Sequence, residues 1–173
     1  MISKYVKGKV YVFIDAANLE NSVKSLGWWV DYKKLYSYFH QETTLVGIRH
    51  YCPRFNDISQ DKFFTVLKRA GICLITKPLK IITEADEFKG KSRKANFDVE
   101  IAVEAQELVD EYDTCVLFSG DSDFDFLVKF LRKKGKRVVI ISSKHHIYRE
   151  LIASCNKYID LKKFRKFIER TEK

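Results

Sequence analysis

The chain has 173 residues, of which 46% are hydrophobic and 32% charged, and its 32 basic and 23 acidic side chains give a net charge of +9. A chain of this length suits one domain that buries about 70% of the surface of its unfolded form, so it needs no disulfide or metal to hold it together. The composition excludes a disordered chain, and the basic balance favours an anionic partner, with nucleic acid ahead of an anionic membrane surface.

The first half of the chain alternates short apolar runs with amphipathic segments. In order, the predicted elements are a strand at 10–14, helices at 18–26 and 32–39, a strand at 45–52, a helix at 59–70 and a strand at 72–76. Asp31 is expected to cap the second helix. Gly27 and Gly71 are expected to end the helices that precede them, and Pro53 to end its strand.

The second half opens with the one long irregular stretch, 77–94, which is rich in lysine and glutamate. It is followed by a helix at 97–112, a strand at 116–118, a helix at 124–133, a strand at 138–141, a helix at 148–154, a strand at 158–161 and a basic helix at 162–169. Val99, Val103 and Leu108 are spaced to form one buried face of the 97–112 helix.

Strands separated by helices indicate βαβ units and a parallel sheet. The predicted fold class is α/β, as a single three-layer Rossmann-like domain in which helices flank a central, mostly parallel sheet. This domain would span 1–161, and the basic C-terminal helix within 162–173 would pack on it or extend it. In such sheets, ligands bind outside the carboxyl ends of the strands, near the point where the strand order reverses.

Carboxylates follow two of the predicted strands. Asp15 follows the first strand, and Asp121 and Asp123 follow the fourth. If these strands are neighbours, the three groups meet at one edge of the sheet, where Asp98 could join them and Asn18 could hydrogen-bond or ligate. Carboxylates at close quarters repel, and Mg²⁺ or Mn²⁺ would relieve that repulsion. Such an ion can lower the pKa of a bound water and stabilise charge on a phosphoryl group.

Each of these residues also has a purely structural explanation. An aspartate at a strand end often caps the next helix, as Ser122 or Asp123 could do here, and Asp98 at a helix start is favourable to the helix dipole. The arrival of the whole set at strand ends and helix starts favours an ion site. Asp125, one turn further on, is assigned a structural role.

The cysteines and the N-terminus bear on the compartment. Cys52, Cys73, Cys115 and Cys155 are too far apart to form a C-x-x-C motif, which fits a reducing environment. There is no signal-peptide pattern and no run of the roughly 20 apolar residues that span a bilayer. We therefore expect a cytoplasmic protein with no membrane partner.

Basic residues are clustered at three places. Four cations lie just ahead of Asp98 and could guide a phosphate backbone to the acids, although a solvated loop is the alternative: Lys89, Lys91, Arg93 and Lys94. The other clusters fall within 129–137 and 162–166. His145 and His146 are assigned to a solvated turn, from which they could touch a substrate.

The sequence resembles the NYN domain family, LabA-like proteins within the PIN-like nuclease superfamily, over about 10–161. The resemblance lies in FIDAANLE at 13–20, KANFDVEIAVEA at 94–105, LFSGDSDFDFLVKFLRKKGKRVVI at 117–140 and ELIASCNKYIDL at 150–161. The SGDSDF segment with its downstream G-K-x-V is the most specific of these. The resemblance implies a PIN-like fold, Mg²⁺ or Mn²⁺, and endoribonuclease activity.

The family's functional positions carry over by alignment of these motifs. Asp15 and Asn18 match the first motif, Asp98 the middle acid, and Asp121 and Asp123 the third motif. Ser119 matches the serine ahead of the third motif; we expect it to hold that loop and count it with the substrate-binding residues.

Two positions depart from the family pattern. Asn96 stands where a glycine is usual, and Glu104 where an aspartate is usual. Six helical steps turn the chain by about 600°, so Glu104 is not expected to be a direct ligand.

The leading interpretation is a metal-dependent ribonuclease. Asp15, Asp98, Asp121 and Asp123 would hold one or two Mg²⁺ or Mn²⁺ ions, Asn18 would orient a water or a phosphate oxygen, and basic segments would bind the backbone. RNA as the partner rests on the resemblance alone. The sequence does not show whether cuts are internal or terminal, and a homodimer is compatible with it.

Two alternatives remain open. One is a catalytically idle RNA-binding or regulatory module of the same fold. The other, with less support, is a phosphatase of the haloacid dehalogenase kind, because Gly120, Asp121 and Asp125 fit its G-D-x-x-x-D motif. That mechanism needs a D-x-D pair after the first strand, where this sequence reads D-A-A-N.

Overall fold

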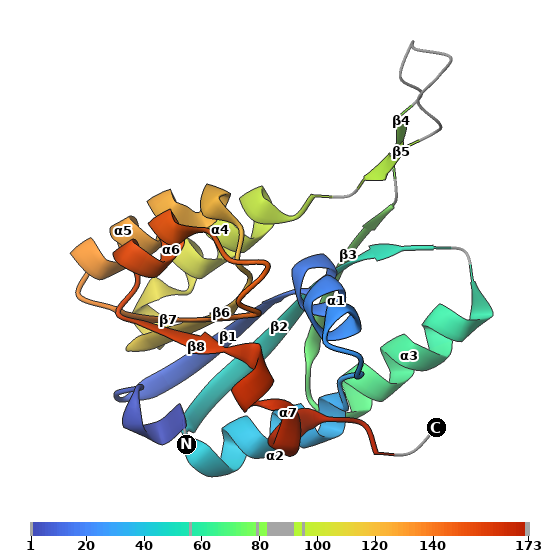
Figure 1. Cartoon of the computed structure of the whole chain (residues 1–173), viewed down its shortest axis with the longest axis horizontal. Helices are drawn as coiled ribbons and strands as arrows, with labels where there is room; N and C mark the ends of the chain where they lie inside the picture. Colours follow the sequence, from blue (N-terminus) through green and yellow to red (C-terminus); the bar gives the residue numbers. More distant parts are fainter. Residues whose placement is uncertain (1, 56, 79, 83–91, 95, 172–173) are drawn as a thin grey trace.

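A single parallel sheet forms the centre of the molecule (Figure 1). The structure, a computed structural model, describes residues 2–55, 57–78, 80–82, 92–94 and 96–171, with the backbone alone for 80–82 and 92–94. The sheet contains β1 (Lys9–Asp15), β2 (Thr44–Arg54), β3 (Cys73–Pro78), β6 (Thr114–Phe118), β7 (Arg137–Ser142) and β8 (Lys157–Asp160). Their order is β3-β2-β1-β6-β7-β8, and every neighbouring pair is parallel. The predicted α/β fold is confirmed.

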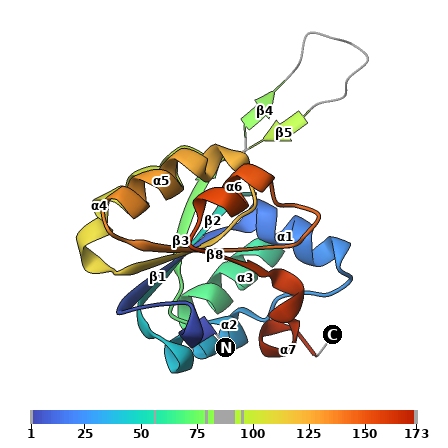
Figure 2. The same ribbon diagram turned by 60° about the vertical axis from the view of Figure 1, so that its left-hand side comes forward.

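Helices cover both faces of the sheet (Figures 1 and 2). They are α1 (Ala16–Ser25), α2 (Tyr32–Glu42), α3 (Ile58–Arg69), α4 (Asp98–Glu107), α5 (Asp125–Lys133), α6 (Arg149–Ser154) and α7 (Arg165–Ile168). The first core cluster packs α1, α2, α3 and α7 against one face, and the second packs α4, α5 and α6 against the other. Within the described residues, no helix has the length and apolar content needed to cross a bilayer.

Strand β1 shows why the sheet lies between two cores. Side chains alternate along a strand, so Val10, Val12 and Ile14 enter the first cluster while Tyr11 and Phe13 enter the second. All five are buried. A strand covered on both faces reads as a continuous apolar run, which is the pattern that predicted it.

The predicted punctuation of the first half is largely correct. Asp31 caps α2 by accepting from the N–H groups of Lys33 and Lys34, and Gly27 and Gly71 follow α1 and α3 with φ of 75° and 85°. These values lie in the left-handed region, which a glycine adopts without steric cost.

The prediction that Pro53 ends its strand is wrong, because β2 continues to Arg54. The pairing of β2 with β1 stops at Tyr51, so Pro53 pairs only with β3 on the other side. A proline is tolerated where a strand has one open side, since the ladder there needs no N–H from it.

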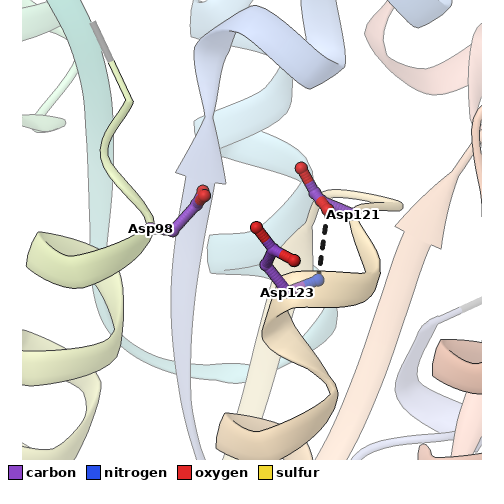
Figure 3. Close-up of side chains that lie close together, drawn as sticks. All are labelled: Asp98, Asp121 and Asp123. Carbon is purple, nitrogen blue, oxygen red and sulfur yellow. Dashed lines mark hydrogen bonds between the residues drawn. The ribbon is translucent and has the colours of Figure 1, made fainter.

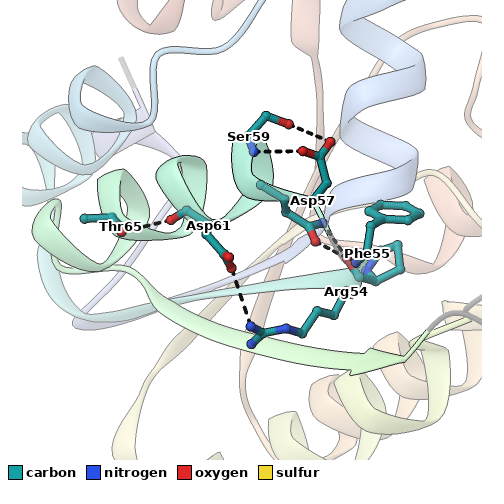
Figure 4. Close-up of polar contacts among 8 residues, drawn as sticks. Arg54, Phe55, Asp57, Ser59, Asp61 and Thr65 are labelled. Carbon is teal, nitrogen blue, oxygen red and sulfur yellow. Dashed lines mark hydrogen bonds and ion pairs between the residues drawn. The ribbon is translucent and has the colours of Figure 1, made fainter.

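The turn from β2 into α3 is closed by side chains (Figure 4). Asp57 caps α3, accepting from Ser59 N at 2.8 Å and Ser59 Oγ at 2.7 Å. Arg54, the last residue of β2, pairs with Asp61 on the first turn of the helix at 3.4 Å. These exposed contacts fix where α3 starts.

Two predictions for the middle of the chain are wrong. Within the stretch predicted to be irregular, β4 (Lys80–Ile82) pairs antiparallel with β5 (Ser92–Lys94), as a ribbon that leaves the body beside β3 (Figures 1 and 2). Helix α4 ends at Glu107 and is followed by a 3₁₀ turn, Val109–Glu111.

The buried face of α4 was also assigned incorrectly. Val99 and Val103 are 73% and 48% exposed, whereas Ile101 and Ala105 are fully buried. Both pairs are four residues apart, so helical spacing alone allowed either face.

The C-terminal segment packs on the body but is less helical than predicted. It begins as a 3₁₀ turn, Leu161–Lys163, and only Arg165–Ile168 form α7. Phe164 is fully buried, with its ring centroid 5.5 Å from that of Tyr38 and 6.3 Å from that of Phe118. The segment is therefore part of the first core cluster.

We expect Phe164→Ala to lower the free energy of unfolding by about 3–5 kcal/mol, the usual cost of removing a buried phenylalanine ring. Its exposed neighbour provides the control, because Lys163→Ala should change stability by less than about 0.5 kcal/mol. Urea denaturation measures both. Equal, small effects would show that the C-terminal segment does not contribute to the core.

Candidate metal centre

The strand order reverses between β1 and β6. Strands β2 and β3 continue the sheet on one side of this pair, and β7 and β8 on the other. The two strands pair in register up to Ile14 and Phe118, so their carboxyl ends lie side by side. The helix after β1 covers one face and the helix after β6 the other, which leaves an open crevice at this edge.

Three carboxylates meet at this edge (Figure 3). Asp98, Asp121 and Asp123 each offer an oxygen, and these atoms all lie within 4.8 Å of one another. Asp98 is the first residue of α4, and the other two flank the start of a 3₁₀ turn, Ser122–Phe124, after β6. Figure 3 shows all three carboxyl groups turned toward the same space.

Local hydrogen bonds position this group. Asp121 caps the 3₁₀ turn by accepting from Asp123 N at 3.1 Å. Asn96 Oδ1 accepts from Asp98 N at 2.8 Å, so a side-chain hydrogen bond from outside helix α4 orients its first residue.

Asp15 lies beside the group rather than within it. Its Oδ1 accepts from Asn18 N and its Oδ2 from Ser119 Oγ, each at 3.2 Å. Burial raises the pKa of Asp15 to about 6 and outweighs these two hydrogen bonds, while the charges of Asp98 and Asp121 raise it further. The structure thus brings three of the four predicted ligands within reach of one ion and leaves the fourth, Asp15, outside that group.

Burial also raises the pKa of Asp98, and the charges of Asp121 and Asp123 act in the same direction. Burial and mutual repulsion make these carboxyl groups resist ionisation, so a nearby cation would stabilise their charged forms. The donor set suits a hard ion, since every member of the group is a carboxylate and, among the described residues, it includes no histidine or cysteine.

Two of the predicted site residues hold the loop after β6. Asn18 Oδ1 accepts from Gly120 N at 3.0 Å, so this oxygen fixes the backbone of the loop, and the predicted role of Asn18 in orienting a water or a phosphate oxygen stays a prediction. Ser119 Oγ donates to Asp15 and accepts from Asp121 N at 3.3 Å. Ser119 is 1% exposed and its hydroxyl sets the loop geometry; its assignment to the substrate-binding residues stays a prediction.

Gly120 allows a second turn to approach the acidic loop. A Cβ at this position would lie 1.8 Å from the carbonyl oxygen of His146 and 2.6 Å from Ser142 Oγ. Tyr148 N donates to Gly120 O at 3.1 Å. The turn after β7 therefore contacts the loop that carries Asp121, and only glycine fits between them.

The side chains of the predicted cationic segment lie outside the part of the chain that the structure describes. Lys89 and Lys91 fall outside the described residues, and Arg93 and Lys94 belong to β5, of which the backbone alone is described. The structure brings a further cation near the site: Lys77, at the carboxyl end of β3, whose positive charge lowers the pKa of Asp98 and so partly offsets the effect of burial. Its place after an apolar run is the same signal that identified Asp15.

Lys77 and Glu104 anchor α4. Lys77 Nζ lies 2.5 Å from Glu100 Oε1 and 4.6 Å from the ring centroid of Phe97. Glu104 accepts from Arg49 at 2.7 Å and from the Tyr51 hydroxyl at 2.5 Å, and it does not join the acidic group.

Comparisons with known proteins identify the family of the chain and support its fold. The family model of the NYN domain matches residues 9–162. The chain is 33% identical over 167 residues to the low amplitude and bright protein LabA of Synechococcus elongatus, covering 95% of this chain and 90% of that protein. A crystal structure of a Vibrio parahaemolyticus protein of unknown function superposes with a TM-score of 0.77 at 25% identity, covering 97% of this chain and 99% of that one.

Gly120→Ala should lower both the free energy of unfolding, by about 1–3 kcal/mol for the forced clash, and the affinity for Mn²⁺, because Asp121 must move with the loop. Gly135→Ala is the control: it also introduces a Cβ, at a φ of 77°, but nothing lies within 4 Å. That variant should lose stability without losing Mn²⁺ affinity. Unchanged Mn²⁺ affinity in Gly120→Ala, measured by calorimetry, would contradict the coupling.

The raised pKa of Asp15 predicts a pH dependence of stability in metal-free protein. Since the folded-state pKa of about 6 exceeds the ordinary value of 3.8, the stability contributed by the protonated group is fully present below about pH 4 and is lost as the pH rises through about 6. In EDTA, Asp15→Asn should melt several degrees above wild type at pH 7.5, where about 1 kcal/mol corresponds to about 2–4 °C. The difference in melting temperature between the two proteins should disappear near pH 4. A difference that stays constant across this pH range would show that burial does not raise the pKa of Asp15.

Proposed function

Because the chain belongs to the NYN domain family, we propose that it is a metal-dependent ribonuclease that hydrolyses RNA phosphodiester bonds at the edge between β1 and β6. The observation that carries the proposal is the convergence of Asp98, Asp121 and Asp123 to within 4.8 Å. These residues come from segments more than twenty positions apart, and ordinary helix capping does not require them to face one another.

The residues present fit Mg²⁺ or Mn²⁺. Asp98, Asp121 and Asp123 would hold the ion, and Asp15, which is electrostatically coupled to Asp98 and Asp121, would add a further carboxylate to the site. When bound, such an ion supplies a water of lowered pKa and neutralises charge on a phosphoryl group. The protein's own part is to hold the carboxylates close together and fixed in place, where a cation would offset their repulsion.

The loop scaffold keeps this arrangement rigid. Ser119 and Asn18 bind the loop through one side-chain oxygen each, so Asp121 has little freedom to turn away. Preorganised charge is effective in catalysis because no reorganisation is needed when the reaction occurs.

A phosphate backbone is the substrate that suits the surroundings. The net charge of +9 favours long anions, although the site itself is acidic. In this proposal, the basic surface of the protein would bind the polyanion, and one phosphate would lie at the acidic centre. The choice of RNA over DNA rests on the family.

The phosphatase alternative loses support from Asp125. Its Oδ2 lies 2.6 Å from Lys129 Nζ, and it does not belong to the acidic group, so the second acid of a G-D-x-x-x-D motif is engaged elsewhere. The idle-module alternative shares the fold and is separated by activity.

The test uses labelled single-stranded RNA, in linear and circular form, with Mn²⁺, Mg²⁺ or EDTA. Wild type should cleave both forms only with metal, and Asp98→Asn and Asp121→Asn should lose about 100-fold or more, since changes around a metal typically cost about 10–100-fold even beyond the direct ligands. Asp110→Asn, an exposed aspartate after α4, is the matched control and should retain activity.

Cleavage that survives EDTA or both substitutions would overturn the mechanism. RNA bound but left intact by wild type under every metal condition would favour the idle module, and cutting of the linear form alone would indicate attack from the ends.

A further inference from the structure

A hollow of about 380 Å³ adjoins the acidic group on the side of β7. Its lining comes from three segments: Asn18, Asp121, His145, His146, Ile147 and Tyr148. We propose that it is a subsite for one unpaired nucleotide of the RNA, next to the phosphate held at the acids. This inference rests on the proposed function and adds a substrate class to it.

One residue belongs to both sites. Asp121 lies within 4.8 Å of the other two acids and also lines the hollow. A nucleotide in the hollow would therefore place an adjoining phosphate beside the carboxylates, as a chain running along the crevice requires.

Hydrogen bonds hold the turn that lines the hollow. Its turn is held by Ser142 Oγ, which donates to His146 O at 3.2 Å, and by Ser143 Oγ, which lies 2.8 Å from His146 Nδ1. Tyr148 N donates to Gly120 O at 3.1 Å, which ties the same turn to the acidic loop. The spacing between hollow and acids is consequently fixed, as in most binding sites for small groups.

The lining offers the two contacts that a nucleotide needs. Tyr148 is 58% exposed, although its backbone is anchored, so its ring is available for a base to stack on. His145 is exposed and presents ring nitrogens that can donate to a phosphate or to a sugar hydroxyl.

The size and the stacking surface favour single-stranded RNA. A volume of about 380 Å³ accommodates one nucleotide but not a duplex. A base can stack on an aromatic side chain only when that base is not already stacked within an RNA helix. Proteins commonly recognise the loops and ends of RNA through such unpaired bases.

The test measures binding without cleavage, so that it does not depend on catalysis. Fluorescence anisotropy would follow a labelled single-stranded RNA hexamer, the same hexamer made of abasic nucleotides, and a blunt RNA duplex, all in Ca²⁺ with probe integrity checked on a gel. Tyr148→Ala should weaken hexamer binding about 10-fold, the loss expected for one stacked base. It should leave the abasic and duplex affinities within about twofold of wild type, and Tyr148→Phe should bind like wild type.

Two further variants sharpen the result. Trp29→Ala removes an aromatic side chain of similar exposure, 62%, outside the hollow, and should not change hexamer binding. His145→Ala should weaken the hexamer and the abasic probe alike, because it contacts the backbone rather than the base.

Tyr148→Ala that binds the hexamer like wild type, or that loses the hexamer and the abasic probe equally, overturns the subsite, as does wild type that binds no hexamer. Base-dependent binding through Tyr148 in a protein that never cleaves RNA would uphold the subsite and overturn the ribonuclease instead.

Discussion

Mutual repulsion among closely spaced carboxylates, half-buried except for the exposed Asp123, is the constraint on which the rest of the site depends. Asp98, Asp121 and Asp123 converge within 4.8 Å, and nearby Asp15 has its pKa raised to about 6 by burial and by the charges of Asp98 and Asp121. A chain gains no stability from such an arrangement in the absence of a cation. It persists because the sheet places the loop after β6 beside the end of β1, and α4 begins with Asp98 at the same edge.

The loops at this edge act as one assembly. Ser119 links Asp15 to the backbone of Asp121, Asn18 holds Gly120, and Gly120 lets the turn after β7 approach to contact distance. Residues that the sequence assigned separately, some as ligands and some to a solvated turn, thus hold one another in place. The same contacts place the hollow at Tyr148 in a fixed relation to the acids, which is why a substrate subsite and a metal centre can be argued from one set of hydrogen bonds.

The order of the elements, the α/β fold and the meeting of Asp98 with Asp121 and Asp123 could be predicted from the sequence, because apolar runs and strand ends are local signals and sheet topology does the rest. The failures came where tertiary contact decides. Helical spacing could not tell Val99 and Val103 from Ile101 and Ala105. No spacing indicates that Asn18 Oδ1 would be used by Gly120 or that the turn at His145 would lie against Asp121, since both depend on loops distant in sequence.

Anomalous diffraction from a crystal soaked in Mn²⁺ tests the central claim most directly. The account predicts a peak in the space enclosed by the carboxylates of Asp98, Asp121 and Asp123, with oxygen ligands from these side chains, and its loss in crystals of Asp121→Asn. A fully soaked crystal of intact protein with no manganese at this edge, or with manganese bound only elsewhere, would contradict it.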